Sequence, residues 1–161
     1  MQPGDILYFT PFYFTDSKAQ QPKNKYFLVL GNFNQQVIVS SLPTSQDYIP
    51  GHLEKDHGCI KSTPEDYFSC FFFKATIPIT ICGWGFPIDT FLYGEQIKTF
   101  DISDSRFQPT LLKPDPYTKI GTCTPETYAN LLGCLVNGAN VTNKYKRLFS
   151  SILKSIELLL R

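Results

Sequence analysis

The fold is decided by residues 25–41, which read Lys25-Tyr26-Phe27-Leu28-Val29-Leu30-Gly31-Asn32-Phe33-Asn34-Gln35-Gln36-Val37-Ile38-Val39-Ser40-Ser41. Two apolar runs, 25–31 and 36–41, are rich in the β-branched and aromatic residues that favour strands. The polar connection between them, which starts at Gly31, is typical of a hairpin. This stretch therefore predicts a pair of antiparallel strands.

Similar short apolar runs occur on both sides of this hairpin, at residues 5–10, 59–62, 70–77 and 97–100. Each is bounded by turn residues, as strands are. Two longer polar stretches, 11–24 and 46–58, interrupt the series and are expected to be loops. Long loops on a small β domain are where function usually sits.

After Pro109 the pattern changes to helices. Thr124 and Pro125 form a helix start signal, with Thr as the N-cap, and Gly138 is placed to end that helix. A second helix with one apolar stripe is expected from about Asn143 to Leu160. We predict a mainly β fold: a small antiparallel barrel over residues 1–110, then a linker and two C-terminal helices over residues 111–161, all packed as a single domain.

The charge of the chain is close to zero, with 15 Lys and Arg against 14 Asp and Glu in 161 residues. This total alone argues against a nucleic-acid partner, because such proteins usually carry a positive excess. This near-zero total is the sum of two segments with opposite net charge, however. Residues 1–110 carry a net charge of −3 and residues 111–161 carry +4. A local basic patch on the acidic half therefore remains compatible with an RNA partner.

The five cysteines are odd in number and show no C-x-x-C spacing, so neither a disulfide framework nor a zinc knuckle is expected. The N-terminus does not read as a secretory signal. Lys74, Pro78 and two glycines interrupt the longest apolar stretch, residues 68–86, so no membrane segment is expected. We predict a reduced, cytoplasmic protein whose thiols pack as small core hydrophobes.

Two histidines of one loop, His52 and His57, are candidate metal ligands, and Asp56 and Cys59 are close to them in the sequence. Nothing else in the chain completes a ligand pattern of known spacing. We therefore interpret them as solvated loop residues and expect no cofactor.

Three motifs in a particular order are more informative. The first is Pro3-Gly4-Asp5 at the start of the first strand. In the second, the strand ending at Ser41 runs into Leu42-Pro43-Thr44-Ser45-Gln46. The third is Glu95-Gln96-Ile97-Lys98-Thr99, followed by Ser105-Arg106. Together they resemble the MazF/PemK family of bacterial toxins, which are ribosome-independent endoribonucleases, over most of residues 3–137.

The resemblance implies an SH3-like barrel that forms a homodimer and binds single-stranded RNA. It also implies a small antitoxin partner, whose acidic, partly disordered segment occupies the RNA groove. The implied reaction needs no metal: the 2′-hydroxyl attacks the adjacent phosphate and leaves a cyclic phosphate and a 5′-hydroxyl. Such a reaction needs a base, an acid and donors to the phosphate.

The resemblance also implies roles for particular residues. Lys25 stands where the family has a catalytic Arg; it keeps the charge, lacks the planar fork and can lose its proton. Thr44 matches the family's catalytic Thr or Ser, with Ser45 as its neighbour. Glu95 matches an acidic residue that some members use for catalysis or RNA contact and that is structural in others. RNA binding is assigned to Lys18, Lys23, Tyr8, Phe12, Tyr13 and Gln46, with core packing as the alternative for the three aromatic residues.

Two other functions remain open at this point. A barrel of this fold that has lost catalysis would be a binding module, and the Lys at position 25 motivates that alternative. A poison of a protein target is the other, since the CcdB toxins share the barrel without being nucleases. The loop 46–58 and the tail after Gly138 are longer than the family pattern implies, and the last helix can cover the barrel, extend the dimer interface or take the place of an antitoxin.

Overall fold

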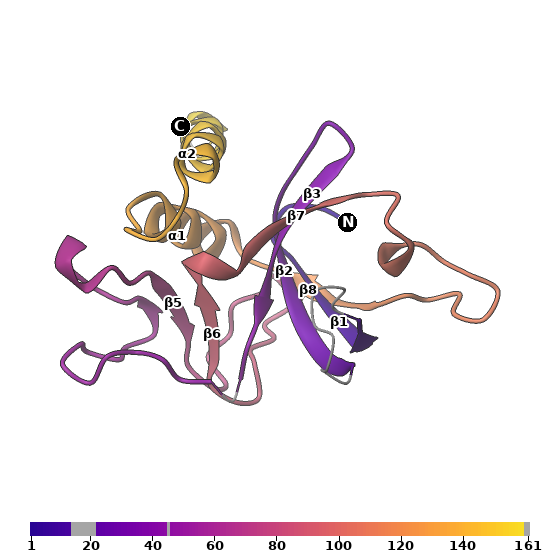
Figure 1. Ribbon diagram of the computed structural model, residues 1–161, viewed down its shortest axis with the longest axis horizontal. Helices are drawn as coiled ribbons and strands as arrows, with labels where there is room; N and C mark the ends of the chain where they lie inside the picture. The colour runs from indigo at the N-terminus through magenta and orange to yellow at the C-terminus, as the bar shows by residue number, and fades with distance from the viewer. Residues whose placement is uncertain (14–21, 45, 160–161) are drawn as a thin grey trace.

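The computed structural model describes residues 1–13, 22–44 and 46–159 (Figure 1). The longer strands form one antiparallel sheet in the order β7-β3-β2-β1-β8, and three short strands form a second, β4-β5-β6. The strands are β1 (Asp5–Phe12), β2 (Lys23–Phe33), β3 (Gln36–Leu42), β4 (Gly58–Cys59), β5 (Cys70–Phe73), β6 (Thr90–Tyr93), β7 (Ile97–Asp101) and β8 (Thr118–Thr122). Three 3₁₀ turns, η1 (Pro64–Asp66), η2 (Gly94–Gln96) and η3 (Ser105–Phe107), connect them.

The predicted hairpin is confirmed as β2 and β3 at the centre of the larger sheet. Its two turn residues, Asn34 and Gln35, have positive φ angles of 49° and 63°. A two-residue hairpin turn whose twist matches the strands needs this left-handed backbone. The turn pairs Phe33 with Gln36, so β2 extends two residues beyond its expected end.

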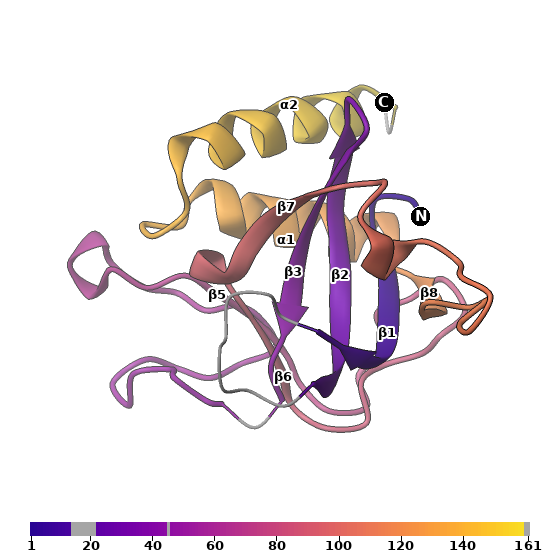
Figure 2. The same ribbon diagram turned by 45° about the vertical axis from the view of Figure 1, so that its right-hand side comes forward.

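The expected closed barrel is wrong. Within the described residues the two sheets do not close on each other, and the fold is mixed α/β (Figure 2). Pro43 follows β3 and has no N–H to continue a ladder. At that point the sheets meet through one backbone bond, in which Phe91 N donates to Pro43 O over 3.0 Å.

Two strands were not predicted from the sequence, β6 and β8. The second of them lies in the segment expected to be a linker and pairs with β1 at the edge of the sheet. Its anchor is the buried carboxylate of Asp5, which accepts hydrogen bonds from Thr122 Oγ1 and from Gln2 N, both over 2.7 Å. Lys119 Nζ lies 3.3 Å from the same carboxylate. The Pro3-Gly4-Asp5 motif therefore has a structural role, since it joins the two strands.

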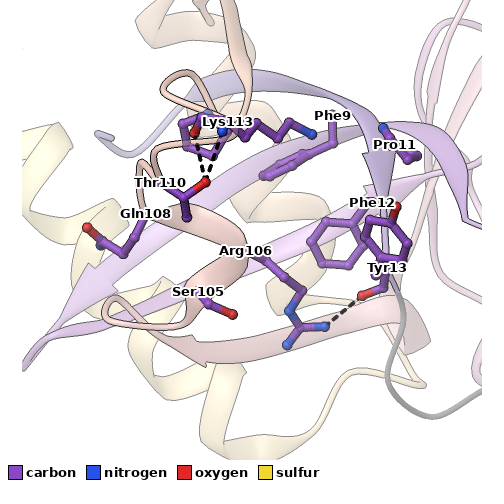
Figure 3. Close-up of a pocket in the computed structure, with 10 residues that line it drawn as sticks. Phe9, Pro11, Phe12, Tyr13, Ser105, Arg106, Gln108, Thr110 and Lys113 are labelled. Carbon is purple, nitrogen blue, oxygen red and sulfur yellow. Dashed lines mark hydrogen bonds between the residues drawn. The ribbon is translucent and has the colours of Figure 1, made fainter.

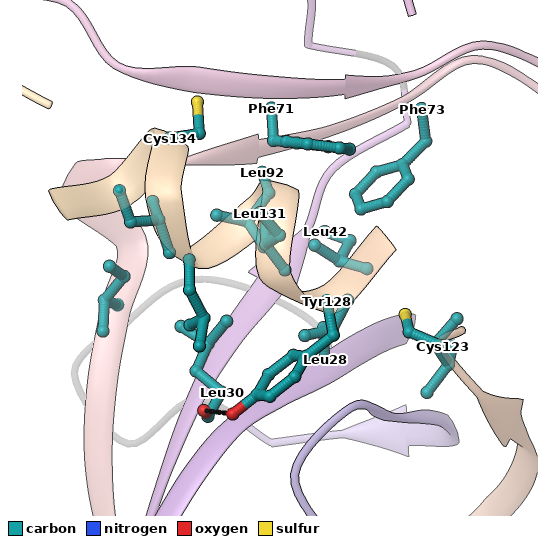
Figure 4. Packing of buried hydrophobic residues seen from close by; sticks show 14 of the residues in the cluster. Leu28, Leu30, Leu42, Phe71, Phe73, Leu92, Cys123, Tyr128, Leu131 and Cys134 are labelled. Atoms are coloured by element: carbon teal, nitrogen blue, oxygen red, sulfur yellow. Dashed lines mark hydrogen bonds between the residues drawn. The ribbon is translucent and has the colours of Figure 1, made fainter. Parts of the chain in front are cut away.

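Both predicted helices are confirmed, as α1 (Pro125–Val136) and α2 (Asn143–Leu159). Thr124 is the N-cap of α1, since its Oγ1 accepts a hydrogen bond from Thr127 N over 3.1 Å. Leucines of α1 pack on one face of the larger sheet, where Tyr128 donates a hydrogen bond to Leu30 O over 2.7 Å (Figure 4). α2 covers α1 (Figure 2).

The opposite face of the sheet carries a separate aromatic cluster. Phe9, Phe12, Phe27 and Phe107 are buried there, with ring centroids 4.6 to 6.3 Å apart. The pairs that Phe9 makes with the other three rings are edge-to-face, and such pairs add about 0.5 to 1.5 kcal/mol each beyond area burial. The sheet is thus covered by helices on one face and by η3 on the other (Figure 1).

One cysteine pair corrects the expectation of five reduced thiols. Cys59 of β4 and Cys134 of α1 form a disulfide with a Cα–Cα distance of 5.5 Å, across 75 residues of sequence. Sequence spacing did not indicate this pair because the fold brings the two residues together. Cys70 and Cys123 are free and buried, and burial raises the pKa of each thiol to about 12. In the part of the chain that the structure describes, no helix is long and apolar enough to cross a membrane.

Candidate functional site

A cavity of about 250 Å³ lies at the end of the larger sheet where β2 begins and β3 ends. Three of its lining residues come from neighbouring strands, because Tyr8 pairs with Tyr26 and Tyr26 pairs with Leu42. The cavity is lined by Tyr8, Asn24, Lys25, Tyr26, Leu42, Thr44, Pro87 and Ile88. Three predicted site residues, Tyr8, Lys25 and Thr44, are therefore brought together.

The two tyrosines form one wall of this cavity. Their ring centroids are 4.5 Å apart, and Tyr26 also packs against Trp84 and Phe86. Burial, together with the neighbouring Tyr8, raises the pKa of the Tyr26 phenol above its ordinary value. The phenol therefore keeps its proton at neutral pH and can donate it to an oxygen of a bound molecule. The sequence did not single out Tyr26 as a site residue.

Lys25 is half-buried at the open end of β2. It pairs with Phe9, and because side chains alternate along a strand it belongs to the opposite face from Tyr26. Burial lowers the pKa of its ammonium group, and the positive charge of Lys23 lowers it further. More of the amine is therefore neutral at a given pH than for a free lysine, which is the form that accepts a proton.

The segment around Thr44 is anchored to β6 on both sides. Before it, Pro43 O accepts the bond from Phe91 N, and after it, Gln46 O accepts a hydrogen bond from the Tyr93 hydroxyl over 2.5 Å. The same hydroxyl accepts a hydrogen bond from Tyr48 N over 2.8 Å. Tyr93 is buried, and burial raises the pKa of its phenol. Tyr93 was also missed, because β6 was not predicted.

The other predicted residues are not gathered at this cavity. Lys18 and Ser45 lie outside the described residues. Glu95 is exposed in η2, after the far end of β6, and does not line the cavity. Gln46 is exposed beside Thr44, and Lys23 is exposed opposite Phe12.

Two predicted aromatic contacts have different environments. Phe12 is only 1% exposed and packs in the aromatic cluster of the other face, as the core-packing alternative expects. Tyr13 is 58% exposed. Of these two rings, Tyr13 alone is available to stack on an incoming base.

The histidines of the 46–58 loop have protein partners. His52 Nε2 lies 2.8 Å from Asp66 Oδ1, and His57 Nδ1 accepts a hydrogen bond from Lys74 N over 3.1 Å. Across residues 1–13, 22–44 and 46–159, no three His, Cys, Asp or Glu side chains lie close enough to hold a metal ion together.

Comparison with known proteins adds no assignment. No protein-family model matches the chain, and no curated protein matches its sequence. The resemblance to MazF/PemK toxins therefore rests on the three sequence motifs and remains a prediction.

Proposed function

We propose that this protein is a MazF/PemK-like endoribonuclease that cleaves single-stranded RNA without a metal. The observation that supports it best is that Lys25, which stands where the family has a catalytic Arg, and Thr44, from the motif that follows the third strand, border the same cavity. The two tyrosines of that cavity supply a phenol and aromatic surface beside them. Unpaired bases are commonly recognised on such rings.

In the proposed reaction each group has one task. The neutral amine of Lys25 takes the proton of the 2′-hydroxyl, which attacks the adjacent phosphorus. The Thr44 hydroxyl donates a hydrogen bond to a phosphoryl oxygen, and a water molecule protonates the departing 5′-oxygen. Each acid or base contributes about 10² to 10⁴ in rate, which is roughly 3 to 5 kcal/mol of barrier.

The remaining assignments belong to the same proposal. Lys18, Lys23 and Gln46 serve as RNA contacts, and Ser45 supports catalysis. The protein acts as a homodimer, a small acidic antitoxin holds it inactive, and the two sheets are an open form of the family's SH3-like architecture. We place it in the cytoplasm with its RNA substrate. Disulfides are rare there, so assays need both the oxidised and the reduced protein.

Expression in a bacterium, followed by mapping of RNA ends, tests this proposal against its two rivals. Growth arrest with new 5′-hydroxyl ends is the expected result. Arrest with intact RNA would instead indicate a protein target, and no arrest would indicate a binding module. The variants Lys25→Ala and Thr44→Ala should each abolish the new ends, whereas Lys61→Ala, which removes an exposed lysine elsewhere, should not.

A further inference from the structure

A second cavity, of about 270 Å³, lies on the aromatic face of the sheet, between β1 and η3 (Figure 3). Its floor is formed by the rings of Phe9 and Phe12, whose centroids are 5.0 Å apart. An apolar cavity of about 150 Å³ is enough to hold benzene. This cavity therefore has room for one larger planar ring.

One wall of the cavity is a rigid, flat cation. The Arg106 guanidinium lies over the Phe12 ring, 5.1 Å from its centroid. Asp104 holds it in place, with bonds of 2.9 Å from Nε and 2.7 Å from Nη2, and Nη1 donates to Tyr13 O over 2.9 Å. The hydrogen bonds from the Arg106 side chain, helped by its charge, lower the pKa of the Asp104 carboxyl, so the pair stays ionised and mutually neutralised. Arg106 therefore forms part of the wall, where its guanidinium also lies 4.7 Å from the centroid of the Phe100 ring.

The rim combines an exposed ring with polar groups. Tyr13 is 58% exposed and stands beside Phe12 (Figure 3). Across the cavity, Thr110 Oγ1 accepts a hydrogen bond from Lys113 N over 2.9 Å, which fixes that part of the rim. Lys113 Nζ is 3.4 Å from Thr10 O and brings a positive charge to the edge. An aromatic floor with a cationic rim suits a planar ring that carries an anionic group.

The strand register links this cavity to the proposed cleavage site. Phe9 of the floor pairs with Lys25, and Phe12 pairs with Lys23. Paired residues of antiparallel strands share a face, with Cβ atoms about 5 Å apart. The two lysines therefore lie next to the floor of the cavity, on the same face, and Lys25 also borders the tyrosine cavity.

We propose that this second cavity receives one unpaired nucleobase of the RNA, next to the phosphate that is cleaved. The base lies against Tyr13 and the Arg106 wall, while Lys113 and Lys23 contact the flanking phosphates. Proteins usually recognise single-stranded nucleic acid by stacking its bases on aromatic rings and by contacting its phosphates with lysines. This inference rests on the proposed function, because the ligand is the same RNA.

The test is a binding measurement with abasic scanning. A short fluorescent RNA that contains the cleaved sequence is made uncleavable by a 2′-deoxy sugar at the scissile nucleotide, and one base at a time is then removed. Wild type should lose affinity about 5- to 150-fold at one position beside the scissile phosphate, the range for a stacked base. Tyr13→Ala should lose a similar factor on intact RNA and nothing more when that same base is missing. Lys113→Met should weaken binding of every RNA alike.

Tyr67→Ala is the matched control, because Tyr67 is an exposed tyrosine far from the cavity in sequence and should leave binding unchanged. If wild type cleaves RNA but Tyr13→Ala and Lys113→Met bind as wild type does, the base pocket is wrong and the nuclease stands. The pocket would also be overturned if Tyr13→Ala weakened binding by the same factor for intact RNA and for every abasic RNA. If wild type neither cleaves nor binds RNA, the proposed function fails and the pocket falls with it.

Discussion

Removing one hydroxyl group, in Tyr93→Phe, should both destabilise the protein and slow its chemistry. The Tyr93 hydroxyl is the point at which β6 holds the chain after Thr44, through Gln46 O at 2.5 Å and Tyr48 N at 2.8 Å. Each intramolecular hydrogen bond contributes about 0.5 to 1.5 kcal/mol net. The loss of both should lower the free energy of unfolding by roughly 1 to 3 kcal/mol, since the ring and its packing remain.

The effect on activity should appear in kcat rather than in KM. Misplacing a reacting group by about 1 Å can cost about 10²-fold in rate, and in the proposed reaction Thr44 acts on the phosphate as charge develops in the transition state. We expect kcat of Tyr93→Phe to fall between about 10- and 100-fold, at a temperature and urea concentration where the variant is fully folded. Tyr48→Phe, which leaves the Tyr48 N–H in place, is the control and should keep both values. A Tyr93→Phe protein with wild-type stability and kcat would refute the anchoring role.

Three further predictions concern other parts of the molecule. Replacing Cys59 and Cys134 by Ser together should lower the free energy of unfolding in urea by roughly 2 to 4 kcal/mol, because their disulfide closes a 75-residue separation. Gly85→Ala should cost about 1 to 3 kcal/mol or more, because the added Cβ would lie 2.2 Å from a backbone carbonyl oxygen. The cleavage rate should rise with pH as Lys25 loses its proton, at a pH below that of a free lysine, and Lys23→Gln should move this rise to higher pH.

Each of these has its own control. A reductant should lower the unfolding midpoint of wild type but leave the double serine variant unchanged; equal midpoints for all forms would contradict the disulfide. Gly51→Ala adds a Cβ into open space and should be nearly neutral, so equal losses for Gly51 and Gly85 would contradict the close approach. The arginine of Lys25→Arg stays protonated. If the cleavage rate of this variant still rises with pH, the titrating group is a residue other than the one at position 25.

The parts of the fold that could be predicted are those in which local chemistry decides the structure. The β2–β3 hairpin, the Thr124 cap and the apolar stripes of α1 and α2 depend on residues a few positions apart, and the structure has all of them. β6 and β8 are short and owe their pairing to strands distant in sequence. The disulfide likewise depends on α1 packing beside β4.

The candidate site also has residues that could be predicted from the sequence and residues that could not. The resemblance singled out the charge of Lys25 by its position and the hydroxyl of Thr44 by its motif, and the structure brings both to one cavity. Tyr26, Tyr93 and the Arg106 wall could not be found from the sequence, because their roles follow from register and from contacts between distant segments. Glu95 was selected by its motif but lies in η2, away from the cavity.

The chemistry of the RNA ends that the purified protein makes in excess EDTA decides whether it is a metal-independent endoribonuclease. The proposal predicts a 2′,3′-cyclic phosphate on one fragment and a 5′-hydroxyl on the other. It also predicts no cleavage when the scissile nucleotide is 2′-deoxy, and no cleavage by Lys25→Ala. Intact RNA under both oxidising and reducing conditions, or cleavage of the 2′-deoxy substrate, would contradict it.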